Sequence, residues 1–105
     1  MTIAIDFDNT WTRDPEFWAE TVKRGRERGI EFVIVTGRSD EGVFGAQVRR
    51  AIQDIPIVFA AMEWKRKAAL RRGWIVDIWI DDMPEYIGPQ DSILIGPKIE
   101  ANRKK

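Results

Sequence analysis

Short apolar runs alternate with longer polar segments along this chain. The runs are rich in Ile, Val and aromatic residues and are too short for buried helices, so the pattern favours strands. They lie at residues 2–7, 30–36, 56–60, 74–80 and 91–96. Nearly continuous apolar character is typical of strands covered on both faces, as in a parallel sheet. We therefore predict five strands in one mostly parallel sheet.

The polar segments between the runs predict three helices. We expect them at about 14–28, 40–53 and 63–72, with a short helical turn at 84–87. Pro15 suits the first turn of the first helix and Gly29 suits its end. Ser39 or Asp40 can cap the second helix. Its apolar positions follow one helical stripe, formed by Phe44, Val48, Ala51, Ile52 and Ile55.

Alternating strands and helices give a parallel sheet with right-handed crossovers and helices on its faces. The predicted fold class is therefore α/β, a Rossmann-like three-layer sandwich with a mostly parallel five-stranded sheet. We expect a single domain over residues 1–100, followed by a short basic tail at 101–105. Ligands of such sheets bind beyond the carboxyl ends of the strands.

Composition narrows the chemistry that is available. The chain has 105 residues, with 17 Lys and Arg against 17 Asp and Glu, and its zero net charge argues against general electrostatic capture of nucleic acid. It contains no Cys and no His, which excludes disulfides, thiolate zinc sites, cysteine nucleophiles and histidine acid–base catalysis. No apolar run reaches the roughly 20 residues that span a bilayer. We expect a cytoplasmic protein without a membrane partner.

Polar residues gather where the predicted strands end. The first, second and fourth strands are followed by Asp6, Asp8, Thr10, Thr36, Gly37, Arg38, Asp81 and Asp82. Carboxylates this close cannot all stay ionised in a dry site without a counter-ion. A hard divalent cation such as Mg²⁺ prefers oxygen ligands of this kind. We therefore expect Asp6 and Asp8 to be paired with a metal ion and a cationic side chain.

These motifs resemble those of a known enzyme family. Asp6-Phe7-Asp8-Asn9-Thr10 resembles the Asp-x-Asp-x-Thr signature of the haloacid dehalogenase-like (HAD) phosphatases. Thr36-Gly37 resembles the second motif of that family, Lys65 or Lys67 its lysine, and Asp81-Asp82 its acidic fourth motif. The four elements follow the order of the family over residues 6–82, and the short connections resemble a small capless member.

The resemblance implies an Mg²⁺-dependent phosphomonoester hydrolase that works through an aspartyl-phosphate intermediate. Asp6 would be the nucleophile, and Asp8 would protonate the leaving oxygen and then activate water. Lys65, nearer the helix start than Lys67, would neutralise the transferring group. Substrate contacts would come from Thr10, Thr36, Gly37, Arg38 and Lys67. The metal would be held by Asp6, the Asp8 backbone carbonyl, and Asp81 or Asp82.

Several alternatives remain open. An open capless site suits a phosphorylated macromolecule, such as a protein or a nucleic-acid end, whereas a neighbouring subunit in a homo-oligomer would suit a small metabolite. The basic third helix and Trp11 favour a polynucleotide-end phosphatase as one rival reading. Trp11 either forms a wall of the site or fills the core. A non-catalytic phosphate- or metal-binding module is the rival from another functional class.

Overall fold

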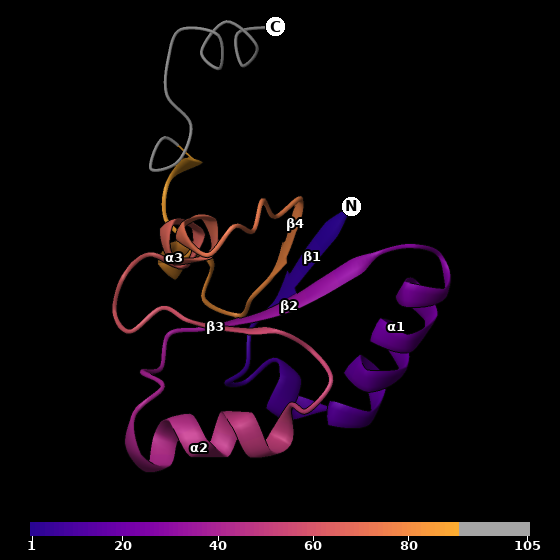
Figure 1. Ribbon diagram of the computed structural model, residues 1–105, viewed down its shortest axis with the longest axis horizontal. Helices are drawn as coiled ribbons and strands as arrows, with labels where there is room; N and C mark the ends of the chain where they lie inside the picture. The colour runs from indigo at the N-terminus through magenta and orange to yellow at the C-terminus, as the bar shows by residue number, and fades with distance from the viewer. Residues whose placement is uncertain (91–105) are drawn as a thin grey trace, which may run out of the picture.

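The computed structural model describes residues 1–90, which form one parallel sheet with helices on both of its faces (Figure 1). The elements in chain order are β1 (Thr2–Ile5), the 3₁₀ turn η1 (Trp11–Arg13), α1 (Pro15–Glu27), β2 (Glu31–Thr36), α2 (Gly42–Ala51), β3 (Ile57–Phe59), α3 (Lys65–Arg71), β4 (Ile78–Ile80) and the 3₁₀ turn η2 (Pro84–Tyr86). The predicted strand at 91–96 and the basic tail at 101–105 lie outside the described residues.

The described sheet has four strands in the order β3-β2-β1-β4, and every neighbouring pair is parallel. β1 lies between β2 and β4, with Ala4 opposite Val33 on one side and Trp79 on the other. The predicted α/β class and parallel sheet are therefore confirmed. Because parallel neighbours run in the same direction, the residues that follow β1, β2 and β4 meet at one edge of the sheet.

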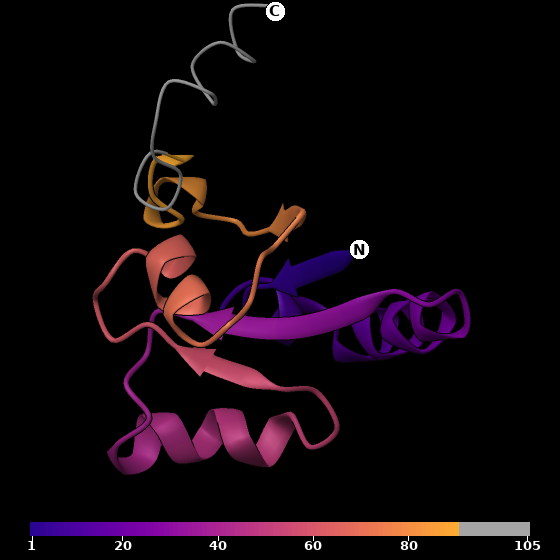
Figure 2. The ribbon, with the colours of Figure 1, turned by 45° about the horizontal axis from the view of Figure 1, so that its top comes forward.

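Helices cover both faces because the central strands are apolar on both sides (Figure 2). Ile5 and Ile34 pack against Val22 of α1 and Val48 of α2 on one face. Ala4 and Val33, the neighbours of those strand residues, pack against Ala68 of α3 on the other face. Successive strand side chains point to opposite faces, so one continuous apolar run fills both layers of the core.

The second helix differs from its prediction at its start and on its outer face. It begins at Gly42, and its N-cap residue Glu41 makes no side-chain capping bond, so the expected cap by Ser39 or Asp40 is wrong. A Cβ at Gly45 would collide with the Asp40 carbonyl, so the preceding loop folds directly onto the helix. Phe44 and Ala51 are exposed, so the buried stripe is narrower than predicted. Val48 and Ile52 carry it.

Strand β4 is shorter than its apolar sequence suggests. The run at 74–80 predicted a strand, but only Ile78–Ile80 pairs with β1. The Trp74 amide instead donates to the Ala69 carbonyl of α3, so the first part of the run closes the turn after that helix.

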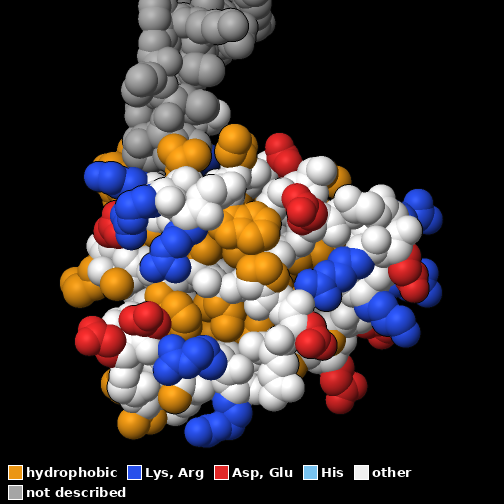
Figure 3. All heavy atoms as spheres, in the orientation of Figure 1, with side chains coloured by type: hydrophobic (Ala, Val, Ile, Leu, Met, Phe, Trp, Pro, Cys, Tyr) orange, Lys and Arg blue, Asp and Glu red, His pale blue; other side chains and the backbone are white. Residues whose placement is uncertain are grey.

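Charged side chains lie over much of the surface, and Lys and Arg gather over α3 (Figure 3). None of the helices in residues 1–90 has the length and apolar character needed to cross a membrane.

Candidate active site at the carboxyl ends of β1 and β4

Asp6 and Asp81 are the first residues after two neighbouring parallel strands. The amide of Asp6 donates to the carbonyl of Ile80 at 2.9 Å, which extends the pairing of β1 and β4 by one further bond. This bond brings the two acidic residues to the same point of the sheet edge. Lys65 reaches this point from the first position of α3.

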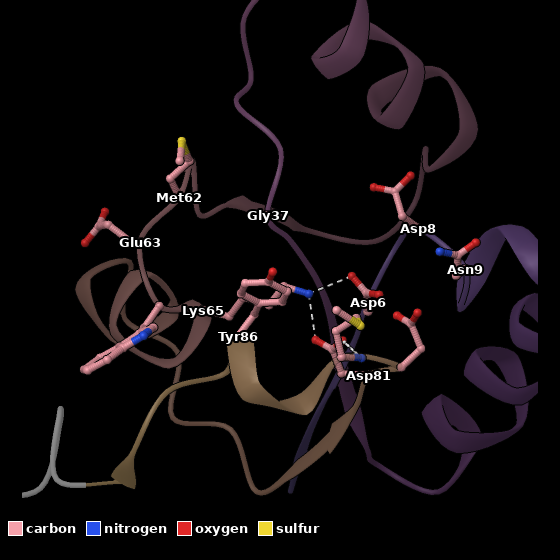
Figure 4. Close-up of a pocket in the computed structure, with 12 residues that line it drawn as sticks. Asp6, Asp8, Asn9, Gly37, Met62, Glu63, Lys65, Asp81 and Tyr86 are labelled. Atoms are coloured by element: carbon pink, nitrogen blue, oxygen red, sulfur yellow. Dashed lines mark hydrogen bonds and ion pairs between the residues drawn. The ribbon is translucent and has the colours of Figure 1, made fainter.

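Lys65 joins the two aspartates. Its Nζ donates to Asp6 Oδ1 at 2.7 Å and to Asp81 Oδ2 at 2.6 Å (Figure 4). The three side chains are almost fully buried, with 6% of Lys65, 7% of Asp6 and 1% of Asp81 exposed. A buried charge needs a partner of opposite sign, and here one ammonium group serves two carboxylates.

The electrostatics of this cluster favour the charged form of Lys65 and disfavour the charged form of Asp6. Burial raises the pKa of Asp6 from 3.8 to about 6, although the hydrogen bond from Lys65 acts against the rise. A contact with Asp82 raises this pKa further. Burial lowers the pKa of Lys65, but the bonds to Asp6 and Asp81 outweigh it and leave the pKa raised. One lysine therefore leaves the acids incompletely neutralised.

Three acids of the cluster have an arrangement that suits a metal ion. Asp6, Asp81 and Asp82 each offer a carboxylate oxygen, and these oxygens lie within 4.8 Å of one another. Thr10 Oγ1 lies 3.3 Å from Asp6 Oδ2 and 3.4 Å from Asp82 Oδ1, so it bridges two of them. A donor set made only of oxygens, with incomplete neutralisation by lysine, fits a hard divalent cation.

The side chain of Asp8 bonds to Arg38 and not to Lys65. Arg38 holds it with two bonds, Nη2 to Oδ1 at 2.6 Å and Nε to Oδ2 at 3.0 Å. Figure 4 shows the Asp8 carboxylate directed away from the Lys65–Asp6 pair. Arg38 Nη1 also donates to the Phe44 carbonyl and to Gln47, and the guanidinium lies over the ring of Phe7 at 5.2 Å. Arg38 is therefore fixed by the protein on several sides.

Other expected site residues lie at varying distances from the cluster. Gly37 borders the pocket at the cluster, whereas Thr36 is fully buried and its Oγ1 accepts from the Arg38 amide at 3.3 Å. Thr36 does not stand at a helix N-terminus, because α2 begins only at Gly42. Lys67 is exposed and does not border the pocket. Trp11 packs in the core with 6% exposed and borders a different cavity, so it is no wall of this site.

A pocket of about 470 Å³ opens above the cluster. Sequence reasoning missed six of the residues that border it: Asn9, Met62, Glu63, Trp64, Met83 and Tyr86. Position alone could have indicated several of them. Met83 and Tyr86 follow the strand-end pair Asp81-Asp82, and Glu63 and Trp64 directly precede the site lysine.

Comparisons with protein-family models, with curated proteins and with solved structures found no match. A function for this chain is therefore argued from the motifs and geometry of the site itself.

Proposed function

We propose that this chain is an Mg²⁺-dependent phosphomonoester hydrolase of the haloacid dehalogenase-like type, with a Rossmann-like domain and Asp6 as the nucleophile. The observation that carries the proposal is the buried Lys65 amine between Asp6 and Asp81 at the ends of adjacent parallel strands. A motif match in sequence does not require these three side chains to meet, whereas the proposed reaction requires a cation beside the nucleophile.

The charge of the pocket supports a metal-dependent reaction. Of the residues in 1–90 that border the pocket, five are acids and Lys65 is the one cation. A dianionic phosphate would be repelled by such a surface. Mg²⁺, held by Asp6, Asp82 and the backbone carbonyl of Asp8, with Asp81 as a further ligand, would supply the positive charge that offsets this repulsion.

In the proposed reaction, a carboxylate oxygen of Asp6 attacks phosphorus and the bond from phosphorus to the leaving oxygen breaks. Asp8 gives its proton to that oxygen, which leaves as an alcohol. Asp8 then takes a proton from a water molecule, which attacks the aspartyl-phosphate and releases inorganic phosphate. Lys65 keeps Asp6 ionised for the first step and stabilises charge on the transferring group.

The contact between Arg38 and Asp8 adds a step to this scheme. Asp8 borders the pocket, but its carboxylate is held on the side of Arg38. Its acid–base role therefore includes a rotation of the side chain toward the bound ester. Arg38 already makes four hydrogen bonds within the protein, which supports a role in positioning Asp8 rather than in contacting substrate.

The proposal is tested with para-nitrophenyl phosphate and the full chain, in Mg²⁺ and in EDTA. We expect turnover that requires Mg²⁺ and that Asp6→Asn lowers by roughly 10⁴-fold or more, as loss of a nucleophile does. Asp77→Asn is the matched control, because Asp77 lies at the opposite end of β4 and bonds to a backbone amide. It should keep wild-type activity.

Other outcomes discriminate between the functional classes. Turnover that persists in Asp6→Asn contradicts the nucleophile assignment. Absence of turnover, together with a melting temperature raised by Mg²⁺, identifies the metal-binding module instead. Indifference of both activity and melting temperature to Mg²⁺ and EDTA excludes the metal site.

A further inference from the structure

The rim of the active-site pocket is apolar, in contrast to its acidic floor. Two short segments form it, 62–64 before α3 and 83–86 after β4. Four of their side chains are large and exposed: Met62 at 97%, Trp64 at 48%, Met83 at 42% and Tyr86 at 57%. Exposed apolar groups gathered around a cavity indicate a binding surface rather than a folding requirement.

Backbone geometry supports this interpretation on one side of the pocket. Ala61 and Met62 have φ angles of 49° and 74°, in the left-handed region that non-glycine residues avoid. The Glu63 amide donates to the Ala60 carbonyl at 3.0 Å and closes this strained turn. Strain of this kind persists where a structure places a side chain for use. The turn leaves Met62 beside the pocket, on the opposite side from Asp8 in Figure 4.

The two rim segments are tied to one another. The Arg66 amide donates to the Ile87 carbonyl at 2.9 Å, and its Nε donates to the Gly88 carbonyl at 3.3 Å. A Cβ at Gly88 would lie 2.6 Å from Cγ of Trp64, so the chain after Tyr86 packs directly on the indole. Trp64 is therefore held in place before a ligand arrives, which lowers the entropic cost of binding.

Charge limits what the rim can bind. Lys65 is the one cation among the described residues that border the pocket, and both of its short contacts are to the acidic floor. Among the described residues, the rim contains two acids, Glu63 and Glu85, and Glu63 is the one of the two that borders the pocket. Within residues 1–90, no cation of the rim would compensate a second phosphate or a carboxylate on the substrate. This charge pattern favours a substrate that is uncharged beyond the reacting phosphate.

We infer that the substrate is a small phosphomonoester whose leaving group carries a flat, uncharged ring, and that Trp64 and Tyr86 bind this ring. The inference rests on the proposed function, because it places the reacting phosphate at Asp6. Aromatic faces and methionine side chains favour flat rings. The volume of about 470 Å³ suits a small molecule. A polynucleotide end is disfavoured by its additional phosphates.

The first test compares matched pairs of esters with the full chain in Mg²⁺. Benzyl phosphate and cyclohexylmethyl phosphate have similar leaving groups and differ in the flatness of the ring. Thymidine 5′-monophosphate and deoxyribose 5-phosphate differ in the presence of a base. We expect kcat/KM to be about tenfold higher for the flat-ring member, mainly through KM, as for base stacking on an aromatic side chain.

The two pairs distinguish the source of the ring. A preference in the nucleotide pair identifies a nucleobase, and a preference confined to the benzyl pair identifies a smaller aryl group. Equal kcat/KM values within both pairs overturn the inference and leave the proposed function intact. If no ester is hydrolysed, calorimetric binding of benzylphosphonate and cyclohexylmethylphosphonate in Mg²⁺ decides the inference by itself, and equal affinities overturn it.

The second test locates the ring. Trp64→Ala should reduce the ratio of kcat/KM between the two members of each pair about tenfold, whereas Trp64→Phe should keep that ratio. Tyr86→Ala provides the same readout if Trp64→Ala fails to fold. Phe17→Ala is the control, since Phe17 is an aromatic residue that is 54% exposed and does not border this pocket. A preference unchanged in both Trp64→Ala and Tyr86→Ala contradicts the inference.

Discussion

The paired strands β1 and β4 carry aspartates at both ends, and the two ends use them differently. At the amino end, Asp77 is exposed and its Oδ2 accepts from the Thr2 amide at 2.8 Å. At the carboxyl end, Asp6 and Asp81 are buried around the amine of Lys65. The same residue type bonds to a backbone amide at one end and forms a buried charged cluster at the other.

The two ends differ in how much hydration each carboxylate loses and in which bonds compensate for that loss. Asp77 satisfies a backbone amide and keeps most of its hydration, so its bond contributes to strand pairing at little cost. Asp6 and Asp81 lose nearly all of their hydration and share one cation, so their attraction to Lys65 only partly offsets desolvation. The buried cluster at the carboxyl end therefore costs stability that the hydrogen bond at the amino end does not, and the proposed reaction at Asp6 would account for that cost.

The largest expected effect comes from removing the shared cation. Lys65→Met should lower the free energy of unfolding by about 3–5 kcal/mol at pH 7.5, because it leaves two buried carboxylates without their shared cation. Denaturant unfolding followed by far-UV circular dichroism measures this. Lys67→Met, an exposed lysine on the same helix, is the matched control and should change stability by less than about 0.5 kcal/mol. If the two substitutions lowered stability equally, the buried ion pairs of Lys65 would not distinguish the carboxyl end of these strands.

A smaller effect follows from the raised pKa of Asp6. The pKa is 3.8 in the unfolded reference and about 6 in the folded protein, so the folded state holds this proton more tightly. The contribution of Asp6 to stability is therefore complete below pH 3.8 and is lost as pH rises through 6. In EDTA, the difference in unfolding free energy between wild type and Asp6→Asn should change by about 3 kcal/mol over this interval.

The measurement is a pair of denaturant titrations at several pH values between 3.5 and 7.5. The sign of the change matters, because wild type should lose stability relative to Asp6→Asn as pH increases. A difference that stays constant, or that changes in the opposite direction, would show that Lys65 fully neutralises Asp6.

The smallest effect belongs to the amino end. Asp77→Ala should destabilise the protein by about 1 kcal/mol through loss of one partly buried hydrogen bond. Asp77→Asn retains an acceptor for the Thr2 amide and should unfold at nearly the wild-type denaturant concentration. A large loss in Asp77→Asn would mean that the charge itself, rather than the hydrogen bond, supports this end of the sheet.

The helices and strands could be predicted where the spacing of apolar residues follows from burial in the core. The runs at 30–36 and 56–60 contain β2 and β3, and Pro15 and Gly29 bound α1 closely. The same rules fail where a partner distant in sequence decides the structure. Phe44 fits a buried stripe, yet it is 68% exposed and lies by the Arg38 guanidinium. The spacing of apolar residues along a helix does not predict this contact between Phe44 and Arg38.

The candidate site was predictable where topology alone brings residues together. Parallel strands require Asp6 and Asp81 to end at one edge, and the first position of α3 favours Lys65 over Lys67. The bidentate contact between Arg38 and Asp8 was not predictable, because it depends on the path of the loop before α2. The apolar rim was missed for a similar reason, since Met62 reaches the pocket through an unusual backbone turn.

Asp6 and Asp8 are separated by one residue, yet they are anchored very differently. The backbone of Asp6 is bonded on both sides, through its amide to Ile80 and through its carbonyl to the amide of Trp11. Asp8 is half exposed, and its carboxylate is held by a single side chain. The proposed reaction would use this division, because an attacking oxygen needs a stationary carrier, whereas a group that serves two successive proton transfers needs freedom to reorient.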